Sequence, residues 1–256
     1  MRTTGMSLGI DVGGSGIKGA PVDLETGRFA ADRVRIETPQ PATPTAVCDA
    51  IKQIVDIFDD ATASGPVGVT VPGVVSAGVV KTAANIDPSW IGFDAGGHLS
   101  DLLGRAVVVV NDADAAGIGE LRHGAAKGQT GLVIVTTLGT GIGTALIHDG
   151  VLVPNSELGH LEIDGRDAET WAASSIKEAE GLSFKEWSGR LQKYYAHLEA
   201  LLWPDLIVVG GGISSKAEKF LPRLELRTPI VAATLENAAG IIGAASLAAD
   251  LERHPS

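Results

Sequence analysis

Cysteine is nearly absent from this chain, which has 256 residues and a single cysteine, Cys48. One cysteine excludes an intramolecular disulfide and a zinc site built from thiolates. It also fits a reducing compartment, where disulfides do not persist. We therefore interpret Cys48 as a small buried hydrophobic residue on a helix.

Positive charge is also scarce. The chain has 20 lysine and arginine residues against 31 aspartate and glutamate residues, a formal net charge of −11, with an isoelectric point near 4.9. Proteins that bind nucleic acid usually present a basic face, and no run of more than two basic residues occurs here. The composition predicts no nucleic-acid partner. Any anionic substrate must be held locally, by glycine-rich backbone, helix N-termini and a few cations.

Long apolar runs are missing as well. Runs such as Ala106–Val110 fall far short of the ~18 residues of a membrane-spanning helix, and Met1–Met6 lacks the apolar stretch of a signal peptide. We expect no membrane partner and a cytoplasmic location. The hydrophobic fraction of 45% and mean hydropathy of +0.20 nevertheless exclude a disordered chain. The length predicts one or two domains.

The order of the elements predicts an α/β fold with two similar halves. In the first half, three antiparallel strands are joined by glycine turns, at Ser7–Val12, Ile17–Leu24 and Arg28–Glu37. The other expected elements of this half are a helix at Thr45–Ala61, strands at Val67–Val75 and Ala106–Val110, and a helix at Asp114–His123. The second half repeats the plan, with strands at Gly131–Leu138, Ile142–His148 and Leu206–Val209 and helices at Ala168–Ala179, Ser183–Trp203 and Glu236–Leu251.

An internal repeat supports this division. The segment Gly14–Ala20 aligns with Gly139–Ala145, and each copy lies between the two strands of a hairpin. Two copies of a strand–glycine turn–strand unit suggest two lobes. We expect an N-terminal lobe of residues 1–112, to which the closing helix returns, and a larger C-terminal lobe of residues 113–256.

The first segment that can carry chemistry runs from Asp11 to Lys18 and reads DVGGSGIK. Its consecutive glycines let backbone amides approach an anion, and Ser15 and Lys18 add a hydroxyl donor and a point charge. Asp11 can hold Mg²⁺ through water as a hard oxygen ligand. No Ser or Thr follows Lys18, and a strand follows the glycines, which excludes the Walker A and Rossmann motifs. The alternative is an ordinary hairpin turn.

Two further glycine turns follow buried strands. Gly139-Thr140-Gly141 can be a matching phosphate loop from the other lobe, and Gly210-Gly211-Gly212 can pass a nucleotide or a phosphate chain over the backbone. The alternative for both turns is a purely structural corner.

Polar side chains end the strand before the helix at Asp114–His123. Asn111 and Asp112 follow the apolar run directly, and a carboxylate there is well placed to accept a proton from an alcohol. We expect Asp114 to cap the helix and Asp112 to act in catalysis. The alternative is that Asp112 also only caps the helix.

A third group of polar residues consists of Glu157, His160 and Glu169. Carboxylates and imidazoles hold sugar hydroxyls because they match both the donor and the acceptor of each hydroxyl. Glu157 and His160 are three residues apart, so one turn can direct both to the same side. With one nearby histidine and no cysteine, a zinc site is disfavoured, and the remaining alternative is a structural histidine.

Together these segments resemble the ROK family of sugar kinases, whose members share a two-lobed, actin-like (ribonuclease H-like) fold with a duplicated strand–glycine turn–strand unit. The resemblance covers nearly the whole chain. Within the family, Leu8–Asp23 and Ala84–Gly92 are similar to the polyphosphate glucokinases.

The resemblance implies a role for each candidate residue. Asp112 is the expected general base for the 6-hydroxyl of the sugar. The sugar-binding set is Asn85, Asn111, Asp112, Glu157, His160 and Glu169. The phosphate-binding set is Asp11, Gly13, Gly14, Ser15, Gly16, Lys18, Gly139, Thr140 and Gly141, with Mg²⁺ at Asp11 through water. Gly210, Gly211 and Gly212 match the adenosine segment, and a homodimer is the family expectation.

Two departures refine this picture. Most family members carry a cysteine-rich zinc loop between the histidine and the last sugar-binding glutamate, whereas here Asp164–Ala168 leads directly to Glu169. The resemblance therefore implies no zinc. Family repressors add an N-terminal DNA-binding segment, and this chain begins within a few residues of its first strand, so we expect a kinase.

The resulting hypothesis is phosphorylation of glucose, with mannose as a second candidate acceptor, by inorganic polyphosphate and ATP. The alternatives are a strictly ATP-dependent hexokinase and a non-catalytic sugar sensor, although retention of Asp11, Lys18 and Asp112 argues against a sensor. Polyphosphate use requires a local basic strip. Its candidates, each of which is otherwise a solvated surface cation, are Lys18, Lys81, Arg122, His123 and Lys127.

Overall fold

The computed structural model describes residues 5–62, 65–83 and 86–253. These residues form two compact units. The first contains the chain up to Gly119 together with the segment from Ala238 onward, and the second contains Glu120–Asn237. The division that the sequence predicts, between residues 112 and 113, lies a short distance before this boundary.

The first unit is built on a mixed sheet with the strand order β3-β2-β1-β5-β8, in which β4 also pairs with β2. Its strands are β1 (Met6–Gly13), β2 (Gly16–Asp23), β3 (Arg28–Phe29), β4 (Val34–Ile36), β5 (Val67–Val71) and β8 (Val107–Asn111). Strand β2 is antiparallel to β1, β3 and β4, and β5 and β8 run parallel to β1. The third predicted strand is divided into β3 and β4 because residues 30–33 are exposed and bury nothing against the sheet.

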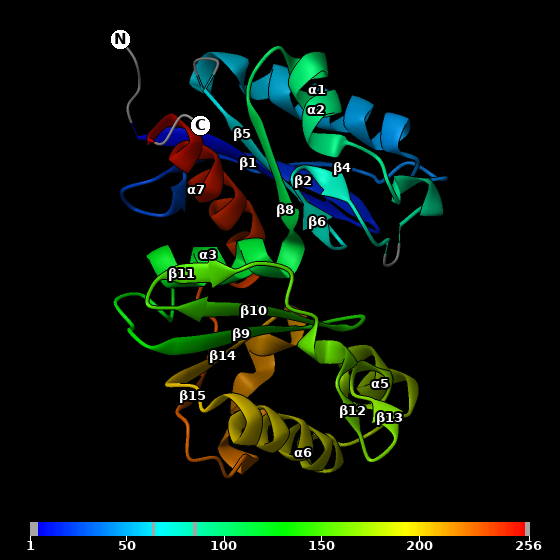
Figure 1. Cartoon of the computed structure of the whole chain (residues 1–256), viewed down its shortest axis with the longest axis vertical. Helices are drawn as coiled ribbons and strands as arrows, with labels where there is room; N and C mark the ends of the chain where they lie inside the picture. The colour runs from blue at the N-terminus through cyan, green and yellow to red at the C-terminus, as the bar shows by residue number, and fades with distance from the viewer. Residues whose placement is uncertain (1–4, 63–64, 84–85, 254–256) are drawn as a thin grey trace. The chain divides into compact units, whose positions relative to one another are not determined.

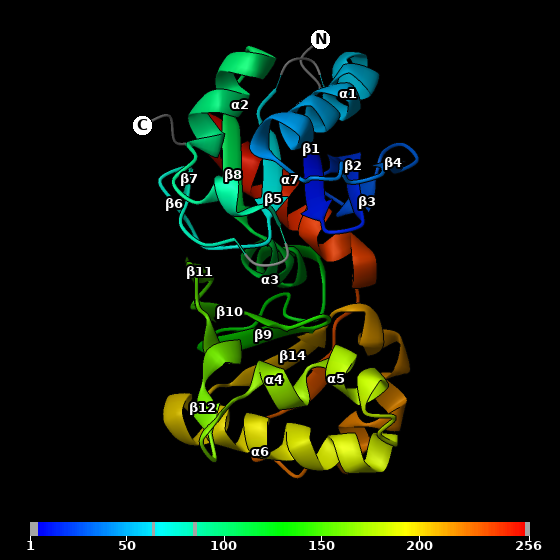
Figure 2. The ribbon, with the colours of Figure 1, turned by 90° about the vertical axis from the view of Figure 1, so that its right-hand side faces the viewer.

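The helices of this unit cover both faces of the sheet. Helix α7 (Ala239–Arg253) lies on the face of Gly9 and Gly68, where an added Cβ would overlap its backbone. Helix α1 (Pro44–Thr62) packs on the opposite face and brings Ile54 against Gly19 (Figures 1 and 2). The remaining elements are α2 (Ala95–Leu103), the start of α3 (Asp112–His123), the 3₁₀ turn η1 (Pro88–Trp90) and the small hairpin of β6 (Val75–Ser76) and β7 (Val79–Val80).

Cys48 lies on the buried face of α1. Its side chain is fully buried, and burial, with a smaller effect from the charge of Asp49, raises the pKa of its thiol to about 12. A thiol that stays protonated at neutral pH behaves as a hydrophobic residue, so the interpretation of Cys48 is confirmed.

The second unit repeats the sheet plan of the first. The strand order is β11-β10-β9-β14-β15, with β9 (Leu132–Leu138), β10 (Ile142–His148), β11 (Val151–Val153), β14 (Leu206–Gly210) and β15 (Ile230–Ala232). Strands β9, β10 and β11 form an antiparallel meander, and β14 and β15 run parallel to β9. In both units a hairpin with a glycine turn is followed by two parallel strands, which confirms the predicted duplication.

One long helix builds the core of the second unit. Helix α6 (Phe184–Leu202) begins at a capping box formed by Ser183 and Glu186. Its apolar face buries Trp187, Leu191 and Tyr195 against the sheet, and Figure 2 shows it along the strands of this unit. The other elements are β12 (Glu162–Ile163), β13 (Arg166–Asp167), α4 (Glu169–Ala172), α5 (Ser174–Ala179) and the 3₁₀ turns η2 (Leu158–His160), η3 (Gly212–Lys219), η4 (Leu221–Arg223) and η5 (Glu236–Ala238).

The helix predicted at Ala168–Ala179 is interrupted. Ala173 has an extended backbone, with φ −59° and ψ 155°, and separates α4 from α5. The break lets the first residues of α5 hydrogen-bond with the turn between β9 and β10. Within the ranges that the structure describes, no helix combines the length and the apolar character needed to cross a membrane.

Candidate functional site

A row of polar side chains crosses the sheet of the first unit beside its glycine turn. The strand register places Thr70, Asp11, Lys18 and Arg35 opposite one another on β5, β1, β2 and β4. Directly opposed residues share one face of a sheet. The Thr70 hydroxyl donates to Oδ1 of Asp11 at 2.9 Å, and Lys18 Nζ lies 4.0 Å from Oδ2 of Asp11. The predicted pair of Asp11 and Lys18 therefore lies together on one face.

The glycine turn between β1 and β2 is supported from outside the hairpin. The Thr38 hydroxyl donates to the carbonyl oxygen of Gly13 at 2.5 Å, and Nη2 of Arg35 donates to the carbonyl oxygen of Ser15 at 2.7 Å. A Cβ added at Gly16 would meet the guanidinium of Arg35. Sequence reasoning missed Arg35. The signal was present only in the pairing of Arg35 with Lys18, which depends on the register of β4.

The loop from β8 into α3 differs from its prediction in one respect. Helix α3 begins at Asp112, and its cap is Asn111, whose Oδ1 accepts from the amides of Ala113 and Asp114 at 2.9 and 3.1 Å. The expectation that Asp114 caps this helix is therefore wrong. Asp114 lies inside the first turn and is buried. The strand ends at Asn111, one residue later than expected. The side chain of Asn111 therefore occupies the capping position directly before the helix.

Asp112 and Asn111 face different environments. Asp112 is exposed, and its Oδ1 accepts from the amide of Ala113 at 2.9 Å. Asn111 is buried, and its Nδ2 donates to the carbonyl oxygen of Gly73 at 3.1 Å. The side-chain amide nitrogen has two N–H groups, and the bond to Gly73 uses one of them. Binding of a ligand by the other N–H group of Asn111 stays a prediction.

The glycine turn of the second unit is supported by hydroxyls. The Ser174 hydroxyl donates to the carbonyl oxygen of Gly139 at 3.0 Å, and the Ser175 hydroxyl donates to that of Thr140 at 2.6 Å. In a planar trans peptide the carbonyl and the following N–H point in opposite directions. The N–H groups of Thr140 and Gly141 are therefore directed away from α5, as a pair suited to an anion.

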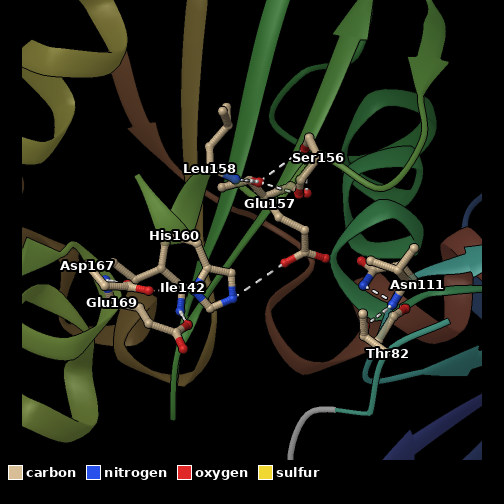
Figure 3. A network of polar contacts seen from close by, with 12 residues as sticks. Thr82, Asn111, Ile142, Ser156, Glu157, Leu158, His160, Asp167 and Glu169 are labelled. Atoms are coloured by element: carbon tan, nitrogen blue, oxygen red, sulfur yellow. Dashed lines mark hydrogen bonds and ion pairs between the residues drawn. The ribbon is translucent and has the colours of Figure 1, made fainter. Parts of the chain in front are cut away.

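Glu157 and His160 lie on one turn, as their spacing predicts. Thr144 holds this turn, because its hydroxyl donates to the carbonyl oxygen of Ser156 at 2.7 Å and accepts from the amide of Leu158 at 3.1 Å. Figure 3 shows the imidazole of His160 directed at Glu157, with Nε2 3.9 Å from Oε2. The two side chains can bind the same ligand.

Asp167 is a second residue that sequence reasoning missed. Its Oδ2 lies 2.8 Å from Nδ1 of His160, and its Oδ1 accepts from the amide of Glu169 at 3.1 Å. The tight hairpin of β12 and β13 delivers this carboxylate, with Asp164 and Gly165 at positive φ in its turn. A carboxylate at Nδ1 fixes a neutral imidazole with its proton on Nδ1, so that Nε2 is an acceptor.

Glu169 joins this group to the glycine turn. Its Oε2 accepts from the amide of Ile142 at 3.0 Å, and a Cβ added at Gly141 would overlap this carboxylate. Glu169, His160 and Asp167 therefore form one connected network beside the turn (Figure 3).

The same network shifts two pKa values. The pKa of Glu157 is raised, first by burial and then by the charge of Glu169, against a lowering by His160. The pKa of His160 is raised, mainly by its hydrogen bond with Asp167 and further by the charges of Glu169, Asp167 and Glu157. Such shifts are common where side chains are arranged for function.

The other predicted positions are placed as follows. Gly211 has φ +82°, and its backbone approaches that of Leu138 too closely to leave room for a side chain. The fold alone therefore requires glycine at this position. Asn85 lies outside the described residues. Of the candidates for a basic strip, Lys81 and Lys127 are exposed, and Arg122 and His123 lie in the last turn of α3.

Comparison with known proteins shows the family to which this chain belongs. The model of the ROK family matches residues 7–179, which is more than half of the chain. The chain belongs to the ROK family. Its fold is the two-lobed sugar-kinase fold of that family, as predicted.

Two polyphosphate glucokinases are similar to the chain in sequence along most of its length. The chain is 53% identical to the polyphosphate glucokinase of Mycobacterium tuberculosis over 93% of its own length and 89% of that protein. It is 51% identical to the polyphosphate glucokinase of Mycobacterium leprae over 93% of its own length and 73% of that protein.

Solved structures agree with these relatives. The inorganic polyphosphate/ATP-glucomannokinase of Arthrobacter sp. strain KM superposes with a TM-score of 0.91 at 52% identity, over 98% of this chain and all of that one. The ROK family glucokinase of Streptomyces griseus, solved with glucose and AMPPNP, gives a TM-score of 0.81 at 27% identity, over 95% of this chain and 99% of that one.

Proposed function

We propose that this chain transfers a phosphoryl group to the 6-hydroxyl of glucose, using inorganic polyphosphate and ATP as donors. The observation that carries the proposal is the 53% identity with a polyphosphate glucokinase over 93% of the chain. The name of the Arthrobacter relative, a polyphosphate/ATP-glucomannokinase, supports ATP as a second donor and mannose as a second acceptor.

Asp112 is the general base of the proposed reaction. The oxygen of the sugar 6-hydroxyl forms a bond with the terminal phosphorus of the donor, and its proton passes to the carboxylate of Asp112. The bond from that phosphorus to the bridging oxygen breaks, and the shortened donor leaves with the electron pair. The exposure of Asp112 at the first turn of α3 supports this role, since the carboxylate must reach a substrate.

The donor phosphates are bound by the two glycine turns. Lys18 supplies a fixed positive charge beside the first turn, and the paired amides of Thr140 and Gly141 supply donors at the second. Phosphoryl transfer depends mostly on positioning and on neutralising charge, which these groups provide without covalent chemistry.

The donor set at Asp11 fits Mg²⁺. Its carboxylate is partly exposed, with 24% of the side chain accessible, and one oxygen is oriented by Thr70. The described residues contain no group of three or more acidic, histidine or cysteine side chains arranged around a metal. Mg²⁺ commonly takes one or two carboxylates and completes its shell with water and substrate phosphates. Bound there, Mg²⁺ would neutralise charge that develops on the transferring oxygens.

The sugar hydroxyls are assigned to Glu157, His160 and Glu169, together with Asn85 and Asn111. Glu157 and the Nε2 atom of His160 offer acceptors on one turn, which suits adjacent hydroxyl groups. Gly210, Gly211 and Gly212 are assigned to the nucleotide when ATP is the donor. A homodimer and a cytoplasmic location remain predictions.

The direct test is a phosphorylation assay with Mg²⁺, in which polyphosphate and ATP are each supplied as the sole donor and glucose and mannose as acceptors. The position of the phosphate on the product is read by NMR. Turnover with polyphosphate that yields glucose 6-phosphate is the expected result. Turnover with ATP alone would replace the proposal with a strictly ATP-dependent hexokinase. Tight glucose binding with no turnover from either donor would replace it with a sugar sensor.

A further inference from the structure

The row across the first sheet ends in an arginine that the proposed reaction does not use. We propose that Arg35 binds inorganic polyphosphate at phosphoryl units beyond the first three, and so contributes to donor choice. The inference rests on the proposed function, because it assumes that polyphosphate occupies the glycine turn between β1 and β2.

The first observation is the position of the guanidinium. Arg35 Nη2 donates to the carbonyl oxygen of Ser15 at 2.7 Å, and the nearest atoms to a Cβ built on Gly16 belong to the same guanidinium. The cation therefore lies directly against the proposed phosphate turn. A guanidinium has five N–H donors, so this bond leaves donors for a phosphate.

The second observation is an uncompensated charge. Lys18 and Arg35 are directly opposed across β2 and β4, and like charges in that position destabilise a sheet. Lys18 faces Asp11 at 4.0 Å. Within the described part of the chain, no carboxylate forms an ion pair with Arg35. A polyanion bound along the row would relieve this repulsion.

The third observation is the direction of the row. It begins at Thr70, which is buried, passes Asp11 and Lys18 with 24% and 28% of their side chains accessible, and ends at Arg35, which is exposed on the sheet edge. The proposal assigns the inner end of the row to the phosphates that both donors possess. ATP then continues as a nucleoside, whereas polyphosphate continues as a charged chain. In this arrangement polyphosphate places further phosphates along the row toward Arg35, and ATP does not.

The contact expected at Arg35 is a fork of two parallel N–H···O bonds to one phosphoryl unit. Arginine binds phosphate in this bidentate way, whereas lysine acts as a point charge. Replacing Arg35 by lysine should therefore keep the electrostatic part of the contact and lose its geometry.

The test compares Arg35→Ala with Arg33→Ala, which removes the same charge from an exposed residue two positions away. Wild type, both alanine variants and Arg35→Lys are assayed with long-chain polyphosphate, tripolyphosphate and ATP. Arg35→Ala should raise KM for long-chain polyphosphate about 10-fold, the loss typical of one charge-assisted hydrogen-bonding group. It should change KM for tripolyphosphate and ATP much less. The dependence of log KM for the long chain on log salt should fall by roughly one.

Arg33→Ala and Arg35→Lys serve as controls that separate a specific contact at Arg35 from general surface charge. Arg33→Ala should behave as wild type with every donor, and Arg35→Lys should fall between wild type and Arg35→Ala. Equal effects of Arg33→Ala and Arg35→Ala would overturn the inference in favour of general surface charge. An equal rise in KM for all three donors would overturn it in favour of a role in holding the Ser15 turn. Absence of polyphosphate turnover in the wild type would instead refute the proposed function.

Discussion

The two glycine turns share one backbone plan and differ in what surrounds them. Each joins the two antiparallel strands at the start of a sheet that continues with two parallel strands. The turn of the first unit is held by Thr38 and the cation Arg35, and the turn of the second by the hydroxyls of Ser174 and Ser175. A duplicated backbone therefore fixes the shape of a turn, while its neighbours decide which ligand group it suits.

The chemistry beside each turn differs in the same way. In the first unit Asp11, Lys18 and Arg35 form a charged row, which suits phosphate and its cation. In the second unit the groups beside the turn are Glu169 and the network of His160 and Asp167, which suits uncharged hydroxyls. We therefore expect changes to the charged row of the first unit to affect the donor and the reaction step, and changes to the network of Glu169, His160 and Asp167 in the second unit to affect the sugar.

The largest effect is expected for Asp112→Asn. Removing the general base should lower kcat by about 10²–10⁴-fold with either donor, because an amide cannot accept the proton. The thermal midpoint should change little, since the variant retains an acceptor for the amide of Ala113, and calorimetry should still show glucose binding through the remaining sugar-binding residues. A kcat within a few-fold of wild type would show that another group is the base.

Matched substitutions of the turns test the comparison directly. Gly16→Ala places a methyl group against the guanidinium of Arg35, and Gly141→Ala places one against the carboxylate of Glu169. We expect Gly16→Ala, which displaces Arg35, to raise KM for long-chain polyphosphate, and Gly141→Ala, which displaces Glu169, to raise KM for glucose. Each rise should be about 10-fold, the scale of one displaced charged hydrogen-bonding group. If both variants raised the same KM, the difference between the two turns would have no functional meaning.

A smaller effect is expected for Asp167→Asn. The hydrogen bond with Asp167 is the main cause of the raised pKa of His160, so the variant should bring this pKa down toward its ordinary value, as measured by NMR titration. The carboxylates of Glu157 and Glu169 remain and keep part of the rise.

The same bond should shape the pH profile of sugar binding. As pH falls through the pKa of His160, Nε2 gains a proton and stops accepting hydrogen bonds, so KM for glucose should rise at acid pH in the wild type. In Asp167→Asn this rise should begin at lower pH. A profile that does not move with the substitution would show that Asp167 serves only the fold.

The smallest effect is expected away from both turns, at Gly189→Ala. Gly189 is exposed inside α6, and an added Cβ meets no atom within 4 Å. Alanine should stabilise the helix by about 0.5–1 kcal/mol, seen as a higher thermal midpoint. The kinetic constants for both substrates should stay at wild-type values, which gives a baseline for the other variants.

Local sequence signals were enough for most of the fold. Both hairpins follow from apolar strands around glycine turns, and α1 follows from its periodic apolar residues. The turn that carries Glu157 and His160 follows from their spacing alone. These features depend on residues close together in the chain, where backbone geometry is nearly fixed by the sequence.

The missed contacts depend on strand register and on the residue at which a strand ends. Arg35 reaches Ser15 only because β4 pairs with β2, and Asp167 reaches His160 only through the β12–β13 hairpin. Asn111 replaces Asp114 as the cap because β8 ends one residue later than its apolar run indicates. A shift of one residue moves a side chain to the other face of a strand, which composition and periodicity do not resolve.

The place of α7 has a consequence for how the protein is made. The first sheet keeps Gly9 and Gly68 bare so that the backbone at Ile241 and Ala244 can lie against them, and those two residues follow the whole second unit in the chain. As the ribosome synthesises the chain from its N-terminus, Glu120–Asn237 emerges before α7 does. Domains fold as units during synthesis, so the second unit can finish folding first. The first sheet stays uncovered on its glycine face until the last helix has left the ribosome.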